Sequence, residues 1–357
     1  MDRRLFVAGL GGAALAQEDK PLRLAVAGLA HGHATGFLRS LVKRTDVELV
    51  GISEQDTSLH GVYGKRFDLP ASRFHAGLES MLEATKPEAV GTFTSTFDHP
   101  AVVEACAKRR IHVMMEKPLA VSIAHAKRIE AAGRAGGIHV LVNYETTWYP
   151  SHAAQRRALS KCGEIRRLVA MDGHQGPKEI GVGPEFLSWL TDPVKNGAGA
   201  LFDFGCYGAT LMTWLFDNQR PRAVTARTLR IKPHIYERVD DEATILVEYP
   251  KATGVIEASW NWPFSRKDFE VYAERGYAHA FGPQSLRVRM PGDRQESVTE
   301  PEPLPADERD SVSYLKAVVR GKLKPSGLSS LENNLIVTEI LDAARRSAES
   351  GRTVYLK

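Results

Sequence analysis

The sequence is poor in features that would assign it to several large classes of protein. Its 357 residues include only three cysteines (Cys106, Cys162 and Cys206), too few and too widely spaced for a disulfide framework or a cysteine-based zinc site. No segment has the length and apolarity of a transmembrane helix, so we expect no stable membrane insertion. Basic residues form no block and the formal net charge is only +4, which argues against a nucleic-acid partner. The length and the hydrophobic content of 43% instead indicate a globular protein of about two domains.

Residues 1–16 have a separate character. A pair of arginines, Arg3 and Arg4, precedes a short apolar run that ends in the small-residue pattern Ala14-Leu15-Ala16. This order is typical of an export signal, and Phe6 after the arginine pair resembles a twin-arginine signal. We expect export to the periplasm, and a cytoplasmic protein with an N-terminal extension is the alternative.

Residues 20–144 alternate short apolar runs with stretches of helical periodicity. The pattern predicts strands at 22–27, 47–53, 89–94, 111–115 and 139–143, with helices at 35–43, 58–67, 100–110 and 121–135. Helices of this length between strands imply parallel pairing through right-handed crossovers. This part is therefore predicted to be an α/β Rossmann domain with a doubly wound parallel sheet that binds NAD(P).

Residues 145–357 follow a different pattern. Runs rich in β-branched and aromatic residues, joined by short polar turns, predict strands at 165–172, 223–230, 243–249, 254–260 and 269–273. These predict an α+β domain with a large, mostly antiparallel open sheet, which holds the substrate. One open face of such a sheet would pair two copies into a homodimer or homotetramer.

The turn after the first strand has the marks of a dinucleotide-binding loop. It reads Gly28-Leu29-Ala30-His31-Gly32-His33, with Ala30 and His33 at two positions where glycine is common. Gly28 would form the tight turn, and backbone N–H groups at the start of the next helix would bind a pyrophosphate. The two histidines have no third ligand nearby in the sequence, so we predict loop histidines beside phosphate and no metal site.

Two later strand ends complete the predicted cofactor site. Glu54 follows the second strand, where a carboxylate would accept hydrogen bonds from the adenosine ribose and would repel a 2′-phosphate, which favours NAD over NADP. Small hydroxyl residues after the strand at 89–94 would form the floor of the site. The predicted residues of this floor are Thr94, Ser95, Thr96 and His99.

Two further motifs carry candidate chemistry. Lys117, in Glu116-Lys117-Pro118, leaves the carboxyl end of a strand and would point into the ligand crevice, at an angle that Pro118 restricts. Asp203 and Tyr207 follow a glycine-rich run and are four residues apart, so on one helix they would share a face.

Together, Gly28 and its loop, Glu116-Lys117-Pro118 and Asp203-x-Gly205-x-Tyr207 resemble the Gfo/Idh/MocA oxidoreductase family. The resemblance implies a nicotinamide cofactor, a sugar or polyol substrate, a catalytic lysine at Lys117 and a substrate-site aspartate at Asp203. Most members have histidine where this chain has Tyr207. Tyrosine occurs there, as the acid/base, in the subgroup that resembles glucose-fructose oxidoreductase and sugar dehydrogenases.

We therefore predict hydride transfer between a sugar hydroxyl carbon and NAD, with Tyr207 as acid/base assisted by Lys117 and Asp203. A cation close to a phenol favours the phenolate, and Lys117 is the predicted cation. Alternatives are a glycosidase that keeps NAD bound and oxidises the sugar transiently, and a non-catalytic NAD-binding sensor. Further candidate contacts to cofactor or substrate are Asn143, Tyr144, His174, His234 and Tyr236.

Overall fold

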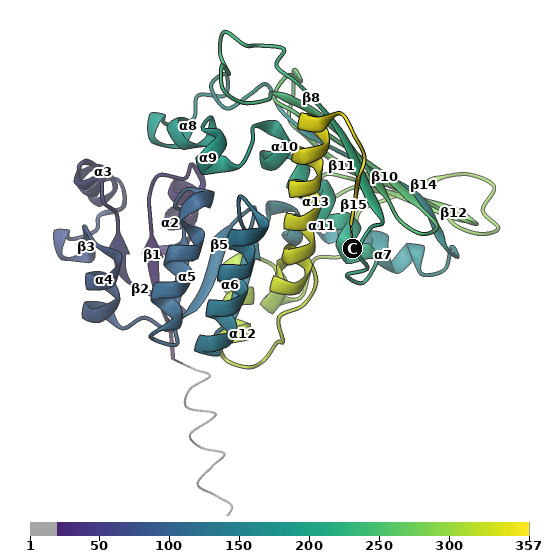
Figure 1. Ribbon diagram of the computed structural model, residues 1–357. Coiled ribbons are helices and arrows are strands. Elements are labelled where there is room, and N and C mark those ends of the chain that lie inside the picture. The colour runs from purple at the N-terminus through teal and green to yellow at the C-terminus, as the bar shows by residue number, and fades with distance from the viewer. Residues whose placement is uncertain (1–19, 357) are drawn as a thin grey trace, which may run out of the picture.

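The computed structural model describes residues 20–356 and confirms the predicted fold class. A parallel six-stranded sheet occupies the N-terminal part, and a separate nine-stranded, mostly antiparallel sheet occupies the C-terminal part (Figure 1). The predicted export signal at residues 1–16 lies outside the described residues.

The N-terminal sheet has the strand order β3-β2-β1-β4-β5-β6, which is the order of a doubly wound nucleotide-binding sheet. Its strands are β1 (Leu22–Ala27), β2 (Val47–Ser53), β3 (Phe74–His75), β4 (Ala89–Thr92), β5 (His112–Glu116) and β6 (Val140–Asn143). Its helices are α2 (His33–Leu41), α3 (Thr57–Phe67), α4 (Leu78–Thr85), α5 (His99–Ala107) and α6 (Ile123–Gly136), with short 3₁₀ turns at Ala71–Arg73 and Thr96–Asp98. The strand order reverses between β1 and β4, where such sheets bind ligands.

Local sequence signals explain several helix boundaries in this domain. The Asp56 carboxylate caps α3 by accepting a hydrogen bond from the Ser58 N–H, and the Ser122 side chain caps α6 in the same way through His125. Gly137 ends α6 in the left-handed conformation that glycine tolerates. The sequence pattern missed β3 and α4, which are short.

The C-terminal sheet has the order β14-β13-β12-β11-β7-β10-β9-β8-β15. Its strands are β7 (Ile165–Gly173), β8 (Ala223–Leu229), β9 (Glu242–Glu248), β10 (Thr253–Ser259), β11 (Arg266–Ala273), β12 (Gly276–Phe281), β13 (Leu286–Arg289), β14 (Ser297–Thr299) and β15 (Val354–Tyr355). All neighbours pair antiparallel except β7 and β10, which are parallel. The prediction omitted β12 to β15. Exposed residues interrupt the apolar pattern in β13 and β14, and β15 has only two residues.

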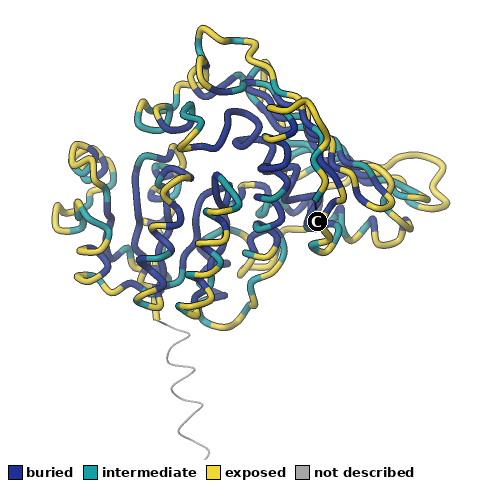
Figure 2. Tube along the Cα trace, in the orientation of Figure 1, coloured by how far each residue is buried: buried dark blue, intermediate teal, exposed yellow. Residues whose placement is uncertain are grey.

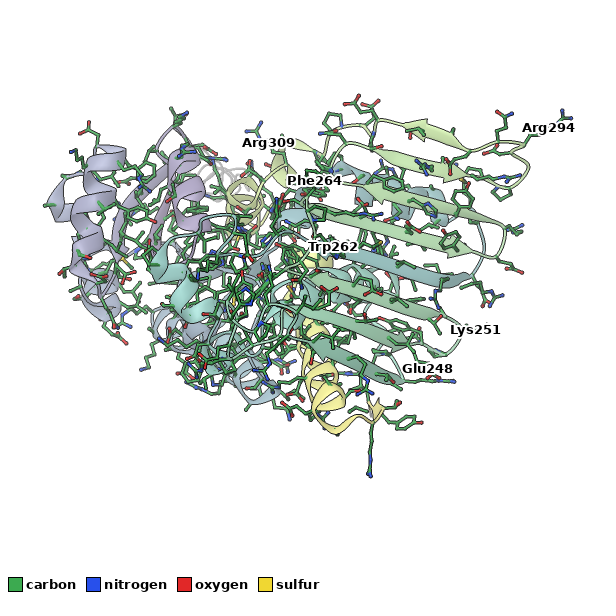
Figure 3. The ribbon with its side chains drawn as sticks, turned by 90° about the horizontal axis from the view of Figure 1, so that it is seen from above. Glu248, Lys251, Trp262, Phe264, Arg294 and Arg309 are labelled. Atoms are coloured by element: carbon green, nitrogen blue, oxygen red, sulfur yellow. The ribbon has the colours of Figure 1, made fainter. Side chains whose placement is uncertain are left out.

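Within the described residues, helices cover one face of this sheet and leave the other open (Figures 1 and 3). The C-terminal part of the chain contains the helices α7 (Pro150–Leu159), α8 (Pro184–Leu190), α9 (Pro193–Asn196), α10 (Ala200–Asp203), α11 (Gly205–Leu215), α12 (Ser311–Val319) and α13 (Leu331–Ser350), with 3₁₀ turns at Glu145–Trp148, Ala306–Glu308 and Gly327–Ser329. Buried alternate residues such as Leu168 and Ala170 of β7 face the helices. The two sheets therefore meet through the layer that holds α10 and α11.

The chain returns to the N-terminal sheet near its end. Val312 and Leu315 of α12 belong to the same hydrophobic cluster as Leu24 of β1, and Arg320 pairs with Glu88 just before β4. Figure 2 shows that the buried segments run through both sheets and the helices between them. In residues 20–356, no helix has the length and apolarity that a membrane span requires.

Candidate active site

A cavity of about 410 Å³ lies where the carboxyl ends of the N-terminal strands face α10 and α11. The turn after β1, Lys117 and the Asp203–Tyr207 segment contribute to its wall, together with a loop after β7 that the prediction did not include. The lining residues are His31, Gly32, His33, Lys117, His174, Pro177, Ile180, Gly181, Val182, Gly183, Phe186, Leu190, Asp203, Phe204, Tyr207 and Lys267. The topology thus brings together residues that lie up to 236 positions apart, from His31 to Lys267.

The turn after β1 needs glycine at its first position. Gly28 has a φ of +85°, and a Cβ atom there would lie 2.7 Å from Cγ2 of Thr94 and 2.8 Å from its backbone nitrogen. No other residue fits this close approach of two backbones. Gly28 thereby places the loop against the end of β4, as in other dinucleotide-binding turns.

The start of α2 suits an anionic group. The N-cap residue, Gly32, makes no side-chain hydrogen bond to the first turn, and that turn contains no acidic residue. Nδ1 and the backbone oxygen of His31 accept hydrogen bonds from the first two N–H groups of the helix, those of His33 and Ala34. The rest of the turn and the positive end of the helix would bind an anion such as a pyrophosphate. The residues present fit the nicotinamide dinucleotide that the sequence predicts.

His31 is held as a neutral base beside this loop. Its ring is 2% exposed and packs against Phe186 and Trp189 at centroid distances of 4.5 and 5.5 Å. Burial, reinforced by the neighbouring His33, lowers the pKa of His31 well below its ordinary value. The Nδ1 atom of His31 accepts a hydrogen bond from the His33 N–H at 3.1 Å, so it orders the loop.

Glu54 lies at the end of β2, as predicted, and contacts the same turn. Its Oε2 accepts a hydrogen bond from the Leu29 N–H at 2.6 Å, and its Oε1 accepts one from the Asp56 N–H at 2.9 Å. A carboxylate in this position faces the side of the turn where an adenosine ribose would lie.

Glu116 is a buried carboxylate with two side-chain partners. His33 Nδ1 lies 3.0 Å from its Oε2, and Asn143 Nδ2 donates to its Oε1 at 2.9 Å. Burial alone would raise the pKa of Glu116, but the two histidines and Asn143 lower it to about 2. The fold also brings one potential ligand atom each of His31, His33 and Glu116 within 4.8 Å of one another. Glu116 is thus a third potential metal ligand, which the sequence analysis did not place beside the two histidines.

Lys117 and Asp203 form a buried ion pair across the two domains. The Nζ atom of Lys117 donates to Oδ1 of Asp203 at 2.5 Å and to its backbone oxygen at 2.8 Å. Trp260 Nε1 donates to the other carboxylate oxygen at 2.9 Å. Burial opposes both charges, yet each partner stabilises the other, so the pKa of Lys117 is raised and that of Asp203 is lowered. The peptide bond between Lys117 and Pro118 is cis.

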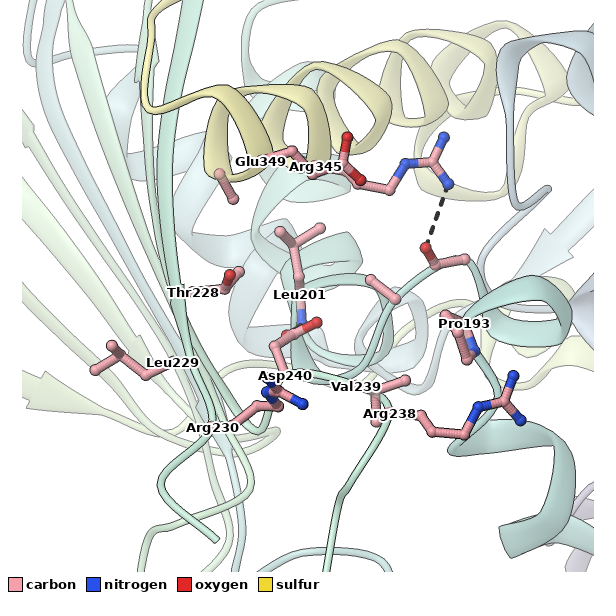
Figure 4. Close-up of a pocket in the computed structure, with 13 residues that line it drawn as sticks. Pro193, Leu201, Thr228, Leu229, Arg230, Arg238, Val239, Asp240, Arg345 and Glu349 are labelled. Atoms are coloured by element: carbon pink, nitrogen blue, oxygen red, sulfur yellow. Dashed lines mark hydrogen bonds between the residues drawn. The ribbon is translucent and has the colours of Figure 1, made fainter. Parts of the chain in front are cut away.

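A second cavity, of about 400 Å³, is lined by residues that hold the glycine-rich run before Asp203 (Figure 4). Asp240 accepts hydrogen bonds from the N–H groups of Gly199 and Leu201 at 2.8 and 2.7 Å, and Arg345 donates to the backbone oxygen of Gly197 at 3.2 Å. A Cβ atom on Gly199 would lie 1.7 Å from the Asp240 backbone oxygen. These hydrogen bonds and close contacts therefore fix the backbone of the glycine-rich run that leads to Asp203.

Asp203 and Tyr207 lie close together, but on two helices rather than on the single helix predicted. The backbone breaks at Phe204, between the end of α10 and the start of α11. A tight contact follows, because Gly208 lies against Ala170 and Ile256 of the sheet and leaves no room for a side chain. Tyr207 is thereby presented at the N-terminal turn of α11.

The ionisation of Tyr207 differs from the prediction. The Lys117 Nζ lies 5.0 Å from the centre of the tyrosine ring, but its charge is already paired with Asp203. Burial raises the pKa of Tyr207 well above its ordinary value, and Cys206 and Glu145 raise it further. Tyr207 is therefore a neutral phenol in this structure, which suits a proton donor.

The other predicted residues lie in three places. His174 lines the cavity, with its ring edge-on to Phe204 at 4.8 Å. Tyr144 is buried behind Tyr207, with the two ring centroids 5.6 Å apart, and Asn143 acts through Glu116. Outside the cavity wall lie Ala30, Thr94, Ser95, Thr96, His99, the exposed His234 and Tyr236, whose hydroxyl donates to Glu179.

Lys267 and the loop from Pro177 to Gly183 were not predicted. Lys267 belongs to the covered face of β11 together with Phe269 and Val271. The prediction began this strand at residue 269, whereas β11 begins at Arg266, so the alternation that includes Lys267 went unseen. That alternation was the signal in the sequence that could have found it.

Comparisons with known proteins agree with this geometry. Residues 22–144 match the model of an oxidoreductase family with an NAD-binding Rossmann fold, and residues 151–279 match the GFO/IDH/MocA C-terminal domain. The chain is 23% identical to trans-1,2-dihydrobenzene-1,2-diol dehydrogenase of Sus scrofa, over 90% of this chain and 94% of that protein. It is 22% identical to the NADP(+)-dependent scyllo-inositol 2-dehydrogenase of Bacillus subtilis, over 87% and 92%.

Two solved structures share the fold over nearly the whole chain. One is an inositol dehydrogenase homologue from Azotobacter vinelandii complexed with NAD+, with a TM-score of 0.81, 19% identity, and coverage of 94% of this chain and 98% of that one. The other is an aldose-aldose oxidoreductase from Caulobacter crescentus complexed with glycerol, with a TM-score of 0.80, 20% identity, and coverage of 94% and 100%.

Proposed function

The chain belongs to the Gfo/Idh/MocA family of NAD-binding oxidoreductases, and on that premise we propose that it oxidises a hydroxyl-bearing carbon of a sugar or polyol, or reduces the corresponding carbonyl. The names of its relatives give a diol, an inositol and an aldose as substrates, and all of these carry several hydroxyl groups. The observation that carries the proposal is the Lys117–Asp203 pair beside Tyr207 in one cavity with the dinucleotide loop.

Lys117 is proposed to bind the reacting oxygen. An ammonium group has three N–H donors, and Asp203 accepts two of them. The third is available to a substrate oxygen, on which negative charge develops in the transition state. Because Asp203 fixes the ammonium through two hydrogen bonds, this donor needs little reorganisation.

Tyr207 is proposed to exchange the substrate proton. In the direction of reduction, its phenol O–H bond breaks and the proton passes to the carbonyl oxygen of the substrate. The raised pKa keeps this proton in place at neutral pH. In the direction of oxidation the phenolate must accept the proton, so oxidation should become faster as the pH rises.

A nicotinamide cofactor, when bound, supplies the acceptor or donor of the hydride. Gly28, Gly32 and the first turn of α2 would hold its pyrophosphate, and Glu54 would face its adenosine ribose. The carboxylate of Glu54 favours NAD over NADP. Replacing Glu54 with serine should narrow the preference for NAD, measured as the ratio of kcat/KM for the two cofactors.

The function is tested with purified protein, a panel of aldoses, polyols and cyclic diols, and each cofactor, by following the absorbance of reduced nicotinamide. The proposal would be supported by reduction of the nicotinamide cofactor that depends on one of these substrates. This reduction should be absent in Tyr207→Phe and in Lys117→Met. Release of sugar from a glycoside without net reduction would instead indicate a glycosidase. Bound NAD with no turnover of either kind would indicate a sensor.

We further propose that the open face of the nine-stranded sheet pairs two copies of the chain. Leu246 of β9 and Tyr272 of β11 are exposed large hydrophobic residues on this face. Sedimentation should then give a dimer or tetramer, and Leu246→Glu should shift the protein toward the monomer.

Export through residues 1–16 is likewise a proposal. It is tested by fractionating cells that express the chain with and without these residues.

A further inference from the structure

Tyr207 has a second lysine beside it, on the sheet side of the cavity. The Nζ atom of Lys267 lies 4.7 Å from the centre of the Tyr207 ring, compared with 5.0 Å for Lys117. Lys267 comes from β11, at the position that pairs with Asp172 of β7. Two ammonium groups from different domains therefore lie within about 5 Å of the centre of this ring.

Glu145 is the ion-pair partner of Lys267 and follows β6 in the N-terminal part of the chain. Its other oxygen accepts a hydrogen bond from the Tyr149 hydroxyl at 2.6 Å. This pair is more accessible than the first, because the Lys267 side chain is 20% exposed and that of Glu145 is 52% exposed. Each lysine near Tyr207 thus has one carboxylate of its own.

Most other titratable groups near Tyr207 are neutral or have their own partners, so these two ion pairs largely determine the charge around it. The Asp172 carboxyl is buried with one oxygen unpaired, and burial raises its pKa well above its ordinary value, which favours the neutral form. The Tyr144 phenol and the Cys206 thiol are also buried and neutral. Glu116 is charged, with His33 and Asn143 as its partners.

We propose that Lys267 is a positioning residue of the reaction, whose charge stabilises the phenolate of Tyr207 and whose effect is limited by Glu145. The inference rests on the proposed function, in which Tyr207 gives its proton to the substrate oxygen. When the O–H bond of Tyr207 breaks and the new O–H bond forms on the substrate, one negative charge stays on the tyrosine. The Lys117 charge is matched by Asp203, so Lys267 and Glu145 decide how well that charge is tolerated.

Opposite shifts of the pH profile test this inference. Lys267→Met removes the cation and leaves the Glu145 carboxylate, so the phenolate becomes harder to form. Glu145→Gln leaves the Lys267 charge unmatched, so the phenolate becomes easier to form. Because burial places the midpoint of the rise of kcat with pH well above the neutral range, it is extrapolated from the rising limb in the direction of oxidation. It should move up by about one pH unit in Lys267→Met and down by a similar amount in Glu145→Gln.

Two controls accompany these variants. Lys267→Arg keeps the charge and should return the midpoint close to that of the unchanged protein. Lys251→Met breaks another lysine–glutamate pair of the same sheet, with Glu164, at its far end (Figure 3), and should leave the profile unchanged. Each variant is checked for folding by thermal unfolding.

Midpoints that move in the same direction in both variants, or in neither, while Tyr207→Phe is inactive, would overturn the role of Lys267 and leave the proposed function standing. Full activity of Tyr207→Phe would instead overturn the proposed function, and this inference with it. Opposite shifts combined with rescue by arginine would support both.

Discussion

The two lysines beside Tyr207 belong to ion pairs of different kinds. In the Lys117–Asp203 pair the side chains are 7% and 9% exposed, and every carboxylate oxygen has a hydrogen-bond partner. In the Lys267–Glu145 pair one partner is half exposed. A buried pair fixes geometry, since each charge depends on the other, whereas an exposed pair can rearrange and acts mainly through its charge.

The pKa shifts extend this contrast to pH. The pKa of Asp203 is lowered in the folded protein, so its contribution to stability is present above its ordinary value and is lost as the pH falls through the folded value. The pKa of Lys117 is raised, so its contribution is present below its ordinary value and is lost as the pH rises through the folded value. The buried pair therefore stays intact over the whole neutral range.

The largest expected effect comes from Lys117→Met. The variant leaves the Asp203 carboxylate buried without its cation, which should lower the free energy of unfolding by about 3–5 kcal/mol. Loss of the donor to the reacting oxygen should also lower kcat by roughly a hundred- to a thousand-fold. Denaturant unfolding and steady-state kinetics measure the two effects.

The double variant Lys117→Met/Asp203→Leu separates stability from catalysis. It replaces both charges with apolar groups, so most of the lost stability should return, while turnover should stay low. A single variant as stable as the unchanged protein would contradict the view that the pair is buried and mutually dependent. Recovery of turnover in the double variant would contradict the role of the Lys117 charge.

Trp260→Phe should have the next largest effect, because it removes only one support of the buried pair. Asp203 would lose the hydrogen bond from the indole at 2.9 Å, and leaving a buried charged acceptor unsatisfied costs about 1–3 kcal/mol. Trp262→Phe, two residues along and partly exposed (Figure 3), is the matched control and should change little. Equal losses of stability and kcat in both variants would show that indole packing, rather than this hydrogen bond, matters.

The two pairs also differ in how far the sequence could reveal them. Lys117 was found because the alternation of strands and helices around β5 is a local pattern, and the end of a parallel strand faces the ligand crevice. The motif predicts Asp203 and Tyr207 but not the break at Phe204, because a single glycine such as Gly205 also occurs inside continuous helices.

The sequence does not predict the ion pair of Glu145 and Lys267, because these residues are 122 positions apart. Charged residues near strand ends are also common, so neither residue stands out by itself. The sequence also does not predict the parallel pairing of β7 with β10. Strands with this pattern usually pair antiparallel, and the apolar pattern does not determine strand direction. The approach of Glu116 to His33 also follows from the sheet order, which brings β1 and β5 to the two sides of β4.

Breaking the exposed pair should hardly affect stability. Lys267→Met and Glu145→Gln should each change the free energy of unfolding by no more than about 1 kcal/mol, because solvent already screens a half-exposed pair. Their effect on the pH profile should be much larger than this loss suggests. A loss of stability comparable to that of Lys117→Met would show that the two pairs are alike, and would remove the contrast between them.

The smallest expected effect is that of salt, which tests the same contrast in the variants already described. At an ionic strength of 1 M the screening length in water falls to about 3 Å, so ions screen the half-exposed Glu145 carboxylate strongly and the buried surroundings of Tyr207 weakly. The pH shift of Glu145→Gln should therefore shrink in high salt, because water and ions reach the half-exposed side of the pair, whereas that of Lys267→Met should shrink less. The loss of stability in Lys117→Met should persist, since buried charges are screened much less. Measuring both variants at low and high ionic strength gives the comparison directly. If high salt diminishes the two effects equally, the Lys117–Asp203 pair is open to solvent, and the distinction between a fixed pair and an adjustable pair fails.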